Sequence, residues 1–209
     1  MIYFDRLFEL KEKYRSALDE DASKRAKIEK DFADGWTTNA CRKYQLEQQD
    51  AALEYCRKTT LEAAEAVKAE AYTMLDRWDT LDATKLPANA AFLAGSSPVT
   101  LTPEEMQQFV DENRYNSTAL RAAKEAADRR GLVLAFPPTA AERKEAFTLF
   151  FDTIAGAVQS GLDSGFYTVE GADRLLQAKI ETNPNLADLE AVAASVAADG
   201  ATSGEGAAV

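Results

Sequence analysis

The stretch that decides the fold is residues 53–81, LEYCRKTTLEAAEAVKAEAYTMLDRWDTL. Its apolar and small side chains recur at steps of three or four residues, as on one face of an α-helix, and the opposite face is charged. These side chains are Leu53, Cys56, Thr60, Ala63, Val67, Ala71, Met74, Trp78 and Leu81. Small residues along the stripe let a partner helix approach closely, while Trp78 and Leu81 supply bulk at one end. We therefore expect a long helix that packs against another helix of the same chain or against another subunit.

The residues before this stretch also have helical periodicity. From Tyr3 to Ala17 the apolar positions alternate by four and three residues, like the seam of a coiled coil. Charged residues then interrupt the seam before Ile28, which predicts a short amphipathic helix or a weak coiled coil. Gly35 is expected to break or kink the helix. Residues 1–86 are thus predicted to be a long helical or coiled-coil region.

A linker and then the start of a new helix follow this region. Pro87 disfavours a helical conformation for the residue before it, so we expect the long helix to end there. Residues 87–100 are rich in Ala, Gly, Ser, Pro and Asn, which predicts a linker. Thr102 and Glu105 have the spacing of a capping box, so a new helix is expected to begin at this point.

The segment 101–136 is predicted to be a helical hairpin with an apolar arm. Asn116 is expected to cap the second helix, and Gly131, after two arginines, marks its end. The arm, Leu132-Val133-Leu134-Ala135-Phe136, has no visible partner strand. We expect it to be extended and to lie either under its own domain or on a neighbouring protein.

The rest of the chain completes an all-α prediction. Thr139 and Glu142 repeat the capping-box pattern, so residues 137–198 are expected to form a C-terminal helical bundle. Residues 199–209 are mostly Gly, Ala and Ser, a composition expected to be flexible alone. The predicted fold is therefore long N-terminal amphipathic helices, a compact helical bundle, an extended apolar arm and a flexible tail.

Charge and hydropathy limit the possible partners and location. The net charge is −11, and residues 139–209 contain 11 acidic and 4 basic residues. Such an acidic segment repels phosphate backbones, so no direct binding to duplex nucleic acid is expected. No apolar stretch approaches the roughly 20 residues needed to span a bilayer, so no membrane association is expected. The first residues do not resemble a secretory signal, which favours a cytoplasmic location.

The sequence offers little that could carry a reaction. It contains no histidine, and it has no glycine-rich phosphate loop and no Cys-x-x-Cys pair. We therefore expect no enzyme activity, catalytic residue, metal site or cofactor. The acidic clusters Asp19-Glu20-Asp21 and Asp76, Asp79 and Asp82 keep a carboxylate-based metal-dependent enzyme as a remote alternative.

The central stretch FLAGSSPVTLTPEEMQQFVDENRYNSTALRAAKEAADRRG, residues 92–131, lies behind a long charged helix. It resembles small structural proteins encoded among the head genes of tailed phages that infect Gram-positive bacteria. Scaffolding proteins are similar in being helical, charged and self-associating. Many of them, however, bind the coat through a basic C-terminal helix pair, whereas this C-terminal third is acidic. The resemblance implies either a scaffold or a capsid-associated accessory protein.

The predicted function is therefore that of a non-enzymatic phage virion assembly or structural protein that associates with itself and with a capsid or other virion protein. A cytoplasmic helical adaptor or regulator that binds a host protein is the alternative. Binding is expected at apolar residues in irregular segments and at the bulky end of the long helix. The candidate partner-binding residues are Phe92, Leu93, Leu132, Val133, Leu134, Phe136, Trp78 and Leu81.

Overall fold

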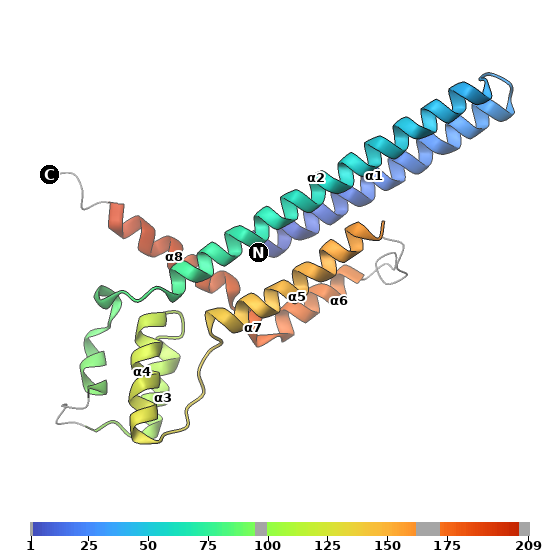
Figure 1. Ribbon diagram of the computed structural model, residues 1–209. Coiled ribbons are helices and arrows are strands. Elements are labelled where there is room, and N and C mark those ends of the chain that lie inside the picture. Colours follow the sequence, from blue (N-terminus) through green and yellow to red (C-terminus); the bar gives the residue numbers. More distant parts are fainter. Residues whose placement is uncertain (1, 95–99, 162–171, 205–209) are drawn as a thin grey trace. The chain divides into compact units, whose positions relative to one another are not determined.

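The computed structural model describes residues 2–94, 100–161 and 172–204. Across these ranges it contains eight α-helices, two short 3-10 helices and no strand (Figure 1), which confirms the all-α prediction. The chain divides into two compact units. Unit 1 comprises Met1–Ala71 and Phe147–Lys179, and unit 2 comprises Tyr72–Ala146 and Ile180–Val209.

Unit 1 begins with a helical hairpin. Helix α1 (Ile2–Ala33) and the first part of α2 (Asn39–Asp79) lie antiparallel, side by side (Figure 1). Gly35, at the turn, has a φ of 76°, a conformation that glycine adopts at little cost. The Trp36 N–H donates a 2.8 Å hydrogen bond to the carbonyl of Asp31 and closes the turn. The break predicted at Gly35 is confirmed.

Two ion pairs link the outer parts of the hairpin helices. Arg25 of α1 lies 2.7 Å from Asp50 of α2, and Arg42 of α2 lies 2.7 Å from Glu29 of α1. These pairs are partly exposed, so each contributes about 0–1 kcal/mol. They fix the register of the two helices more than they stabilise the fold.

The core of unit 1 is aromatic and lies at the N-terminal end of α1. The ring of Phe4 is 5.6 Å from that of Phe147 and 5.1 Å from that of Phe150, measured between centroids. Both partner rings belong to α5 (Ala140–Gln159). Further along α1, Tyr14 is buried together with two α5 residues, Ala157 and Val158. α5 therefore packs against the first half of α1, from Phe4 to Tyr14.

Unit 2 is assembled from shorter elements. They are η1 (Ala83–Lys85), η2 (Ala88–Leu93), α3 (Pro103–Glu112), α4 (Ser117–Arg130), α7 (Pro184–Ala187) and α8 (Leu189–Gly204). α4 contacts α3, η1 and η2. Its inward face is rich in alanine, because Ala119, Ala123, Ala126 and Ala127 are all buried. These small side chains allow close packing of the neighbouring elements. The remaining helix, α6 (Ala172–Thr182), begins in unit 1 and ends in unit 2.

Both predicted capping boxes are present. The Glu105 N–H donates to the Thr102 hydroxyl over 3.2 Å, and the Thr102 N–H donates to the Glu105 carboxylate over 2.8 Å. The Thr139 N–H donates to Glu142 over 2.8 Å, with the return bond at 3.3 Å. Each cap satisfies backbone donors that a helix start leaves without partners. The helix starts predicted from these pairs are confirmed.

The apolar arm lies on its own unit. Gly131 ends α4 in the left-handed conformation, with a φ of 65°, as predicted. The arm that follows is neither helix nor strand. The side-chain amide of Gln107 accepts from the Ala135 N–H and donates to the Ala135 carbonyl, each over 2.9 Å. One side chain thus satisfies both backbone groups of Ala135, as a neighbouring strand would.

Three predicted boundaries differ from the structure. α2 ends at Asp79 rather than at residue 86. The chain then turns, and Asp82 accepts the Thr84 N–H over 3.0 Å and caps η1. η2 occupies the first part of the predicted linker 87–100. α8 continues to Gly204, past the predicted end at residue 198. The last part of the predicted tail, residues 205–209, lies outside the described residues.

Candidate interaction surfaces

The predicted partner-binding residues all belong to unit 2, where two of them are core residues. Trp78 and Leu93 are buried. The Trp78 indole N–H donates a 2.7 Å hydrogen bond to the carbonyl of Tyr115, at the turn before α4. Both residues therefore contribute apolar contacts inside the unit.

The other predicted residues are accessible to different degrees. Leu81 and Phe92 are exposed, and Val133 is 98% exposed. Leu132, Leu134 and Phe136 are half-buried. The arm therefore alternates, with Val133 turned to solvent and its neighbours on either side turned toward the unit. Leu81, Phe92 and Val133 are the predicted residues that an external protein can reach.

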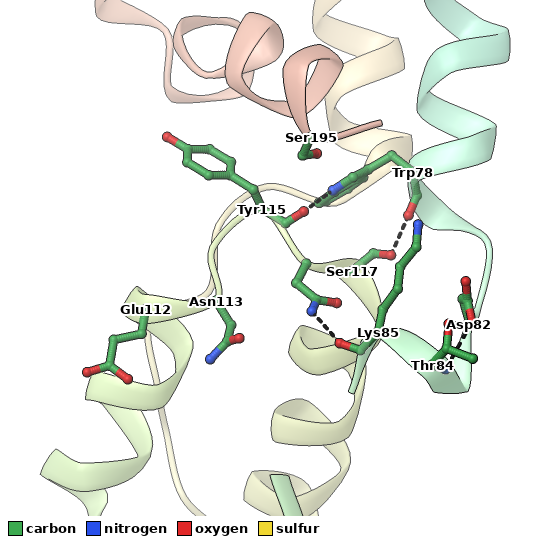
Figure 2. A pocket seen from close by; sticks show the side chains of 10 residues that line it. Trp78, Asp82, Thr84, Lys85, Glu112, Asn113, Tyr115, Ser117 and Ser195 are labelled. Carbon is green, nitrogen blue, oxygen red and sulfur yellow. Dashed lines mark hydrogen bonds between the residues drawn. The ribbon is translucent and has the colours of Figure 1, made fainter. Parts of the chain in front are cut away.

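One hollow of unit 2 is polar and about 540 Å³ in volume. It lies between the end of α2, the α3–α4 turn and Ser195 of α8 (Figure 2). Its lining includes Asp82, Lys85 and Glu112. Hydrogen bonds from the side chain and backbone of Thr84 hold the pKa of Asp82 below its ordinary value. Asp82 is therefore an ionised cap, which makes it a poor proton donor near neutral pH.

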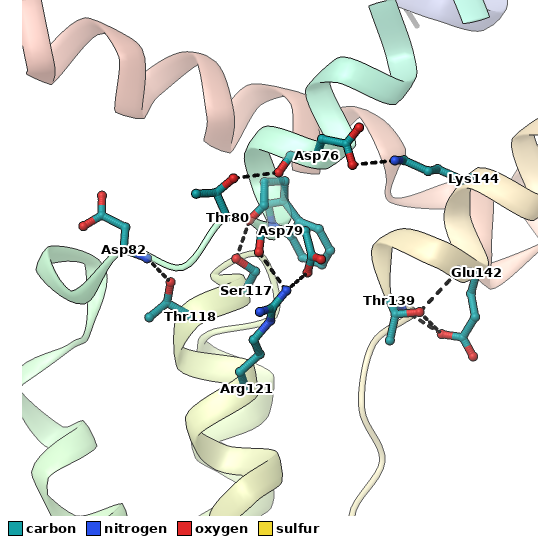
Figure 3. A network of polar contacts seen from close by, with 11 residues as sticks. Asp76, Asp79, Thr80, Asp82, Ser117, Thr118, Arg121, Thr139, Glu142 and Lys144 are labelled. Atoms are coloured by element: carbon teal, nitrogen blue, oxygen red, sulfur yellow. Dashed lines mark hydrogen bonds and ion pairs between the residues drawn. The ribbon is translucent and has the colours of Figure 1, made fainter. Parts of the chain in front are cut away.

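The carboxylates in the last turn of α2 and just after it hold parts of unit 2 together (Figure 3). Asp76 accepts from the Lys144 ammonium over 2.5 Å, and Asp79 lies 2.7 Å from Arg121. Asp82 caps η1, and its N–H donates to the Thr118 hydroxyl over 3.1 Å. The sequence analysis kept these three aspartates as possible metal ligands. In the structure each of them interacts with a different part of unit 2. Among the described residues, no three His, Cys, Asp or Glu side chains come together to hold a metal ion.

The second acidic cluster lies on α1 and also has local partners. Glu20 is 2.8 Å from Lys24, and Asp21 is 2.6 Å from Arg25, each one turn along the helix. The hydrogen bond with Lys24 lowers the pKa of Glu20. These pairs are typical of a charged helix surface.

Arg143 is a buried cation that the sequence did not indicate. Its side chain, at the start of α5, is 0% exposed. Its Nε donates to the Pro138 carbonyl over 3.2 Å, and its guanidinium lies 5.7 Å from the centroid of the Trp78 ring. Nη1 and Nη2 have no hydrogen-bond partner in the described part of the chain. Burial lowers the pKa of Arg143, and the charge of Asp188 opposes this effect.

The outer part of the α1–α2 hairpin has no buried side chain. Tyr14 is the last buried residue of α1, and Thr60 is the first buried residue of α2. Trp36, at the turn, is 84% exposed, and Tyr44 and Tyr55 on α2 are 61% and 71% exposed. These three aromatic residues were not among the predicted binding residues. Their signal was a tryptophan directly after the turn glycine and two tyrosines outside the apolar stripe.

Comparisons with known proteins identify no relative. No protein-family model matches the chain, and no curated protein or solved structure is significantly similar to it. None of the helices in the described ranges combines the length and apolar character needed to cross a lipid bilayer. The two exposed regions, on the hairpin and on unit 2, are therefore the basis for a functional proposal.

Proposed function

We propose that the chain is a non-enzymatic assembly or structural protein of a tailed-phage virion that binds a capsid protein and associates with itself. The carrying observation is the outer hairpin, where no side chain between Tyr14 and Thr60 is buried. Ordering so many residues costs conformational entropy, and partly buried side chains such as Leu18 and Leu53 offset only part of that cost. Its use therefore lies in contacts with other protein.

The hairpin turn offers an anchor for such a contact. Trp36 is 84% exposed and follows Gly35, whose positive φ fixes the path of the turn. Tryptophan is enriched among the residues that contribute most to protein–protein binding, because it buries a large apolar area with few rotatable bonds. An exposed tryptophan at the end of a helical rod suits insertion into a pocket of a partner.

Unit 2 offers a second contact region. Leu81, Phe92 and Val133 are exposed there. Leu81 and Phe92 belong to the connector after α2, and Val133 belongs to the arm. The backbone of the arm is held by Gln107, so binding through Val133 would cost little additional ordering. We assign capsid binding to these residues and to Trp36.

The experiment is co-expression of the chain with the capsid protein encoded by a neighbouring gene, followed by sedimentation of the particles. The wild-type chain is expected in the particle fraction. Trp36→Gln and Val133→Gln should each reduce incorporation at least several-fold. Leu149→Gln is the matched control, because Leu149 is an exposed apolar residue on α5, outside the proposed contacts.

Two outcomes would contradict the proposal. Particles could form and sediment while the chain stays in the supernatant. The chain could instead be recovered with a soluble host protein and be absent from particles, which would favour the adaptor alternative.

A further inference from the structure

The outer side of α2 carries a second series of residues with coiled-coil spacing. All of its members are exposed, and successive members are three or four residues apart: Cys41, Tyr44, Gln48, Ala51 and Tyr55. This spacing places them on one face of the helix. They begin just after the hairpin turn and end before Thr60, where the core begins.

This face is turned away from α1. The α2 residues that contact α1 include Arg42 and Asp50, through the ion pairs with Glu29 and Arg25. At 100° per residue, Tyr44 and its series lie on the opposite side of the helix from Arg42. No described residue of unit 1 covers the two tyrosines, which are 61% and 71% exposed.

The corresponding outer face of α1 is different in character. Counting 100° per residue from the α2-facing positions places the following residues on it: Ser16, Asp19, Ser23, Lys27 and Lys30. This face contains no apolar side chain and is typical of a solvated helix surface. The aromatic character of the outer hairpin helices is therefore concentrated on α2.

We propose that two copies of the chain pair through this face of α2, in antiparallel orientation about Gln48. The pattern is self-complementary around that residue. Tyr44 of one copy meets Ala51 of the other, and Tyr55 meets Cys41, so each large side chain faces a small one. A two-fold interface requires such matching, because each residue must fit the surface it faces. This pairing deepens the proposed function, from which it takes self-association, and identifies the surface.

Charged residues beside this face affect the affinity of the two copies for each other. Lys43 of one copy lies level with Glu54 of the other. Glu54 also pairs with Arg57 of its own chain at 2.5 Å, so it would be shared between the two cations, and its charge favours the antiparallel arrangement. The two Glu47 side chains approach each other near the axis, and this repulsion weakens pairing. Among the described residues, the ion-pair partner of Glu47 in its own chain is Lys43, at a distance of 3.9 Å. Neutralising Glu47 should therefore strengthen the pair.

The expected interface is small. Four tyrosines that each bury part of about 150–250 Å² give a contact of roughly 800 Å² with their neighbours. That area is below the roughly 1,200–2,000 Å² of a stable complex, so we expect a dissociation constant of about 1–100 μM. Pairing would become strong when many copies are held close together.

The first test is sedimentation equilibrium of the full chain over a range of concentrations. The wild-type chain is expected to pass from monomer to dimer. Tyr44→Glu with Tyr55→Glu should weaken dimerisation at least 30-fold, and Glu47→Gln should strengthen it several-fold. Circular dichroism should show unchanged helix content, because both tyrosines are exposed. A wild-type chain that stays monomeric at several hundred micromolar would overturn the proposal.

The second test locates the axis by cross-linking. In a chain with Cys41→Ala and Cys56→Ala, Gln48→Cys should form a disulfide-linked dimer under mild oxidation. Ser23→Cys, on the polar face of α1 at a similar height along the hairpin, is the control and should stay largely monomeric. Equal cross-linking at the two positions would contradict pairing through α2.

The two proposals fail in different ways. A chain that enters capsid particles but never dimerises keeps the proposed function and removes the pairing surface. A chain that dimerises but never enters particles does the reverse. If the double tyrosine variant of a monomeric chain loses capsid binding, the face belongs to the capsid protein and pairing between copies is wrong.

Discussion

At the scale of single residues, the buried guanidinium of Arg143 is a destabilising feature of unit 2. A fully buried guanidinium loses its hydration, and here it is compensated by one hydrogen bond to Pro138, by the Trp78 ring and by the charge of Asp188 acting without a hydrogen bond. Each buried donor without a partner costs about 1–3 kcal/mol, and a cation–π contact returns about 0.5–2 kcal/mol. The balance favours an uncharged side chain of similar length.

Arg143→Met is therefore expected to stabilise the protein. Methionine keeps most of the volume and removes the two nitrogens that have no partners. We expect the free energy of unfolding to rise by about 1 kcal/mol, which raises the melting temperature by about 2–4 °C. Differential scanning calorimetry checks the shift. A lower melting temperature for Arg143→Met would show that the charge has a stabilising partner.

Glu142 makes helix stability dependent on pH. Hydrogen bonds from the backbone and side chain of Thr139 hold its pKa below the ordinary value for glutamate. A lowered folded-state pKa means that the contribution is fully present above the unfolded pKa and is lost as pH falls through the folded pKa. Thermal melts from pH 7 to pH 3 should show Glu142→Gln less stable than wild type at pH 7. A gap that stays constant with pH would contradict this mechanism.

The sequence showed which segments are apolar, but it did not show which of their side chains are buried. Phe92 and Leu93 are adjacent and both apolar, yet Phe92 is exposed and Leu93 is buried. Trp78 was predicted to supply bulk for a helix contact, and its stripe gave no sign that its indole N–H would bind Tyr115. Such differences depend on contacts between residues far apart in the chain, which periodicity does not encode.

At the scale of elements, local chemistry determined several helix ends. The boxes at Thr102 and Thr139 and the glycines at 35 and 131 satisfy groups within a few residues, so their effect can be predicted from the sequence alone. The end of α2 could not be. There the Arg121 side chain donates to the Asp79 carbonyl over 2.8 Å (Figure 3), and Thr118 accepts from the Asp82 N–H. Both partners belong to α4.

The arm is the element whose position depends most on one side chain. Gln107→Ala removes both hydrogen bonds to Ala135, at a cost of about 1 kcal/mol of local stability. Amide hydrogen exchange at Ala135 should become roughly fivefold faster. Gln107→Glu keeps the acceptor and loses the donor, so an intermediate rate is expected. Unchanged exchange in Gln107→Ala would show that the arm is held by its apolar side chains alone.

At the scale of the whole molecule, the outer hairpin is predicted to be dispensable for folding. Replacing residues 24–51 with a short Gly-Ser turn removes no buried side chain. The ion pairs that are lost contribute about 0–1 kcal/mol each, so the melting temperature should change by only a few degrees. The shortened chain should also be monomeric in sedimentation. Loss of the cooperative melting transition would show that this segment stabilises the fold.

The sequence described the whole molecule at the level of fold class. Helical periodicity and the scarcity of strand signals predicted an all-α chain, and this is confirmed for the described residues. The sequence did not predict that the outer hairpin has no fully buried side chain. The apolar stripe of α2 starts at Leu53 and was expected to be covered by a partner helix from that residue onward. The part of α2 that is covered depends on where α5 ends. The sequence of α2 alone does not show this.

The contrast between the two tryptophans has a practical consequence. The sequence contains two of them, and Trp36 is almost fully accessible, whereas Trp78 is enclosed and hydrogen-bonded. Their fluorescence should therefore separate by wavelength and by sensitivity to a dissolved quencher. Each reports on a different event, with Trp36 sensing whatever docks at the turn and Trp78 sensing unfolding of unit 2. Binding of a partner can therefore be followed by the intrinsic fluorescence of the unlabelled chain.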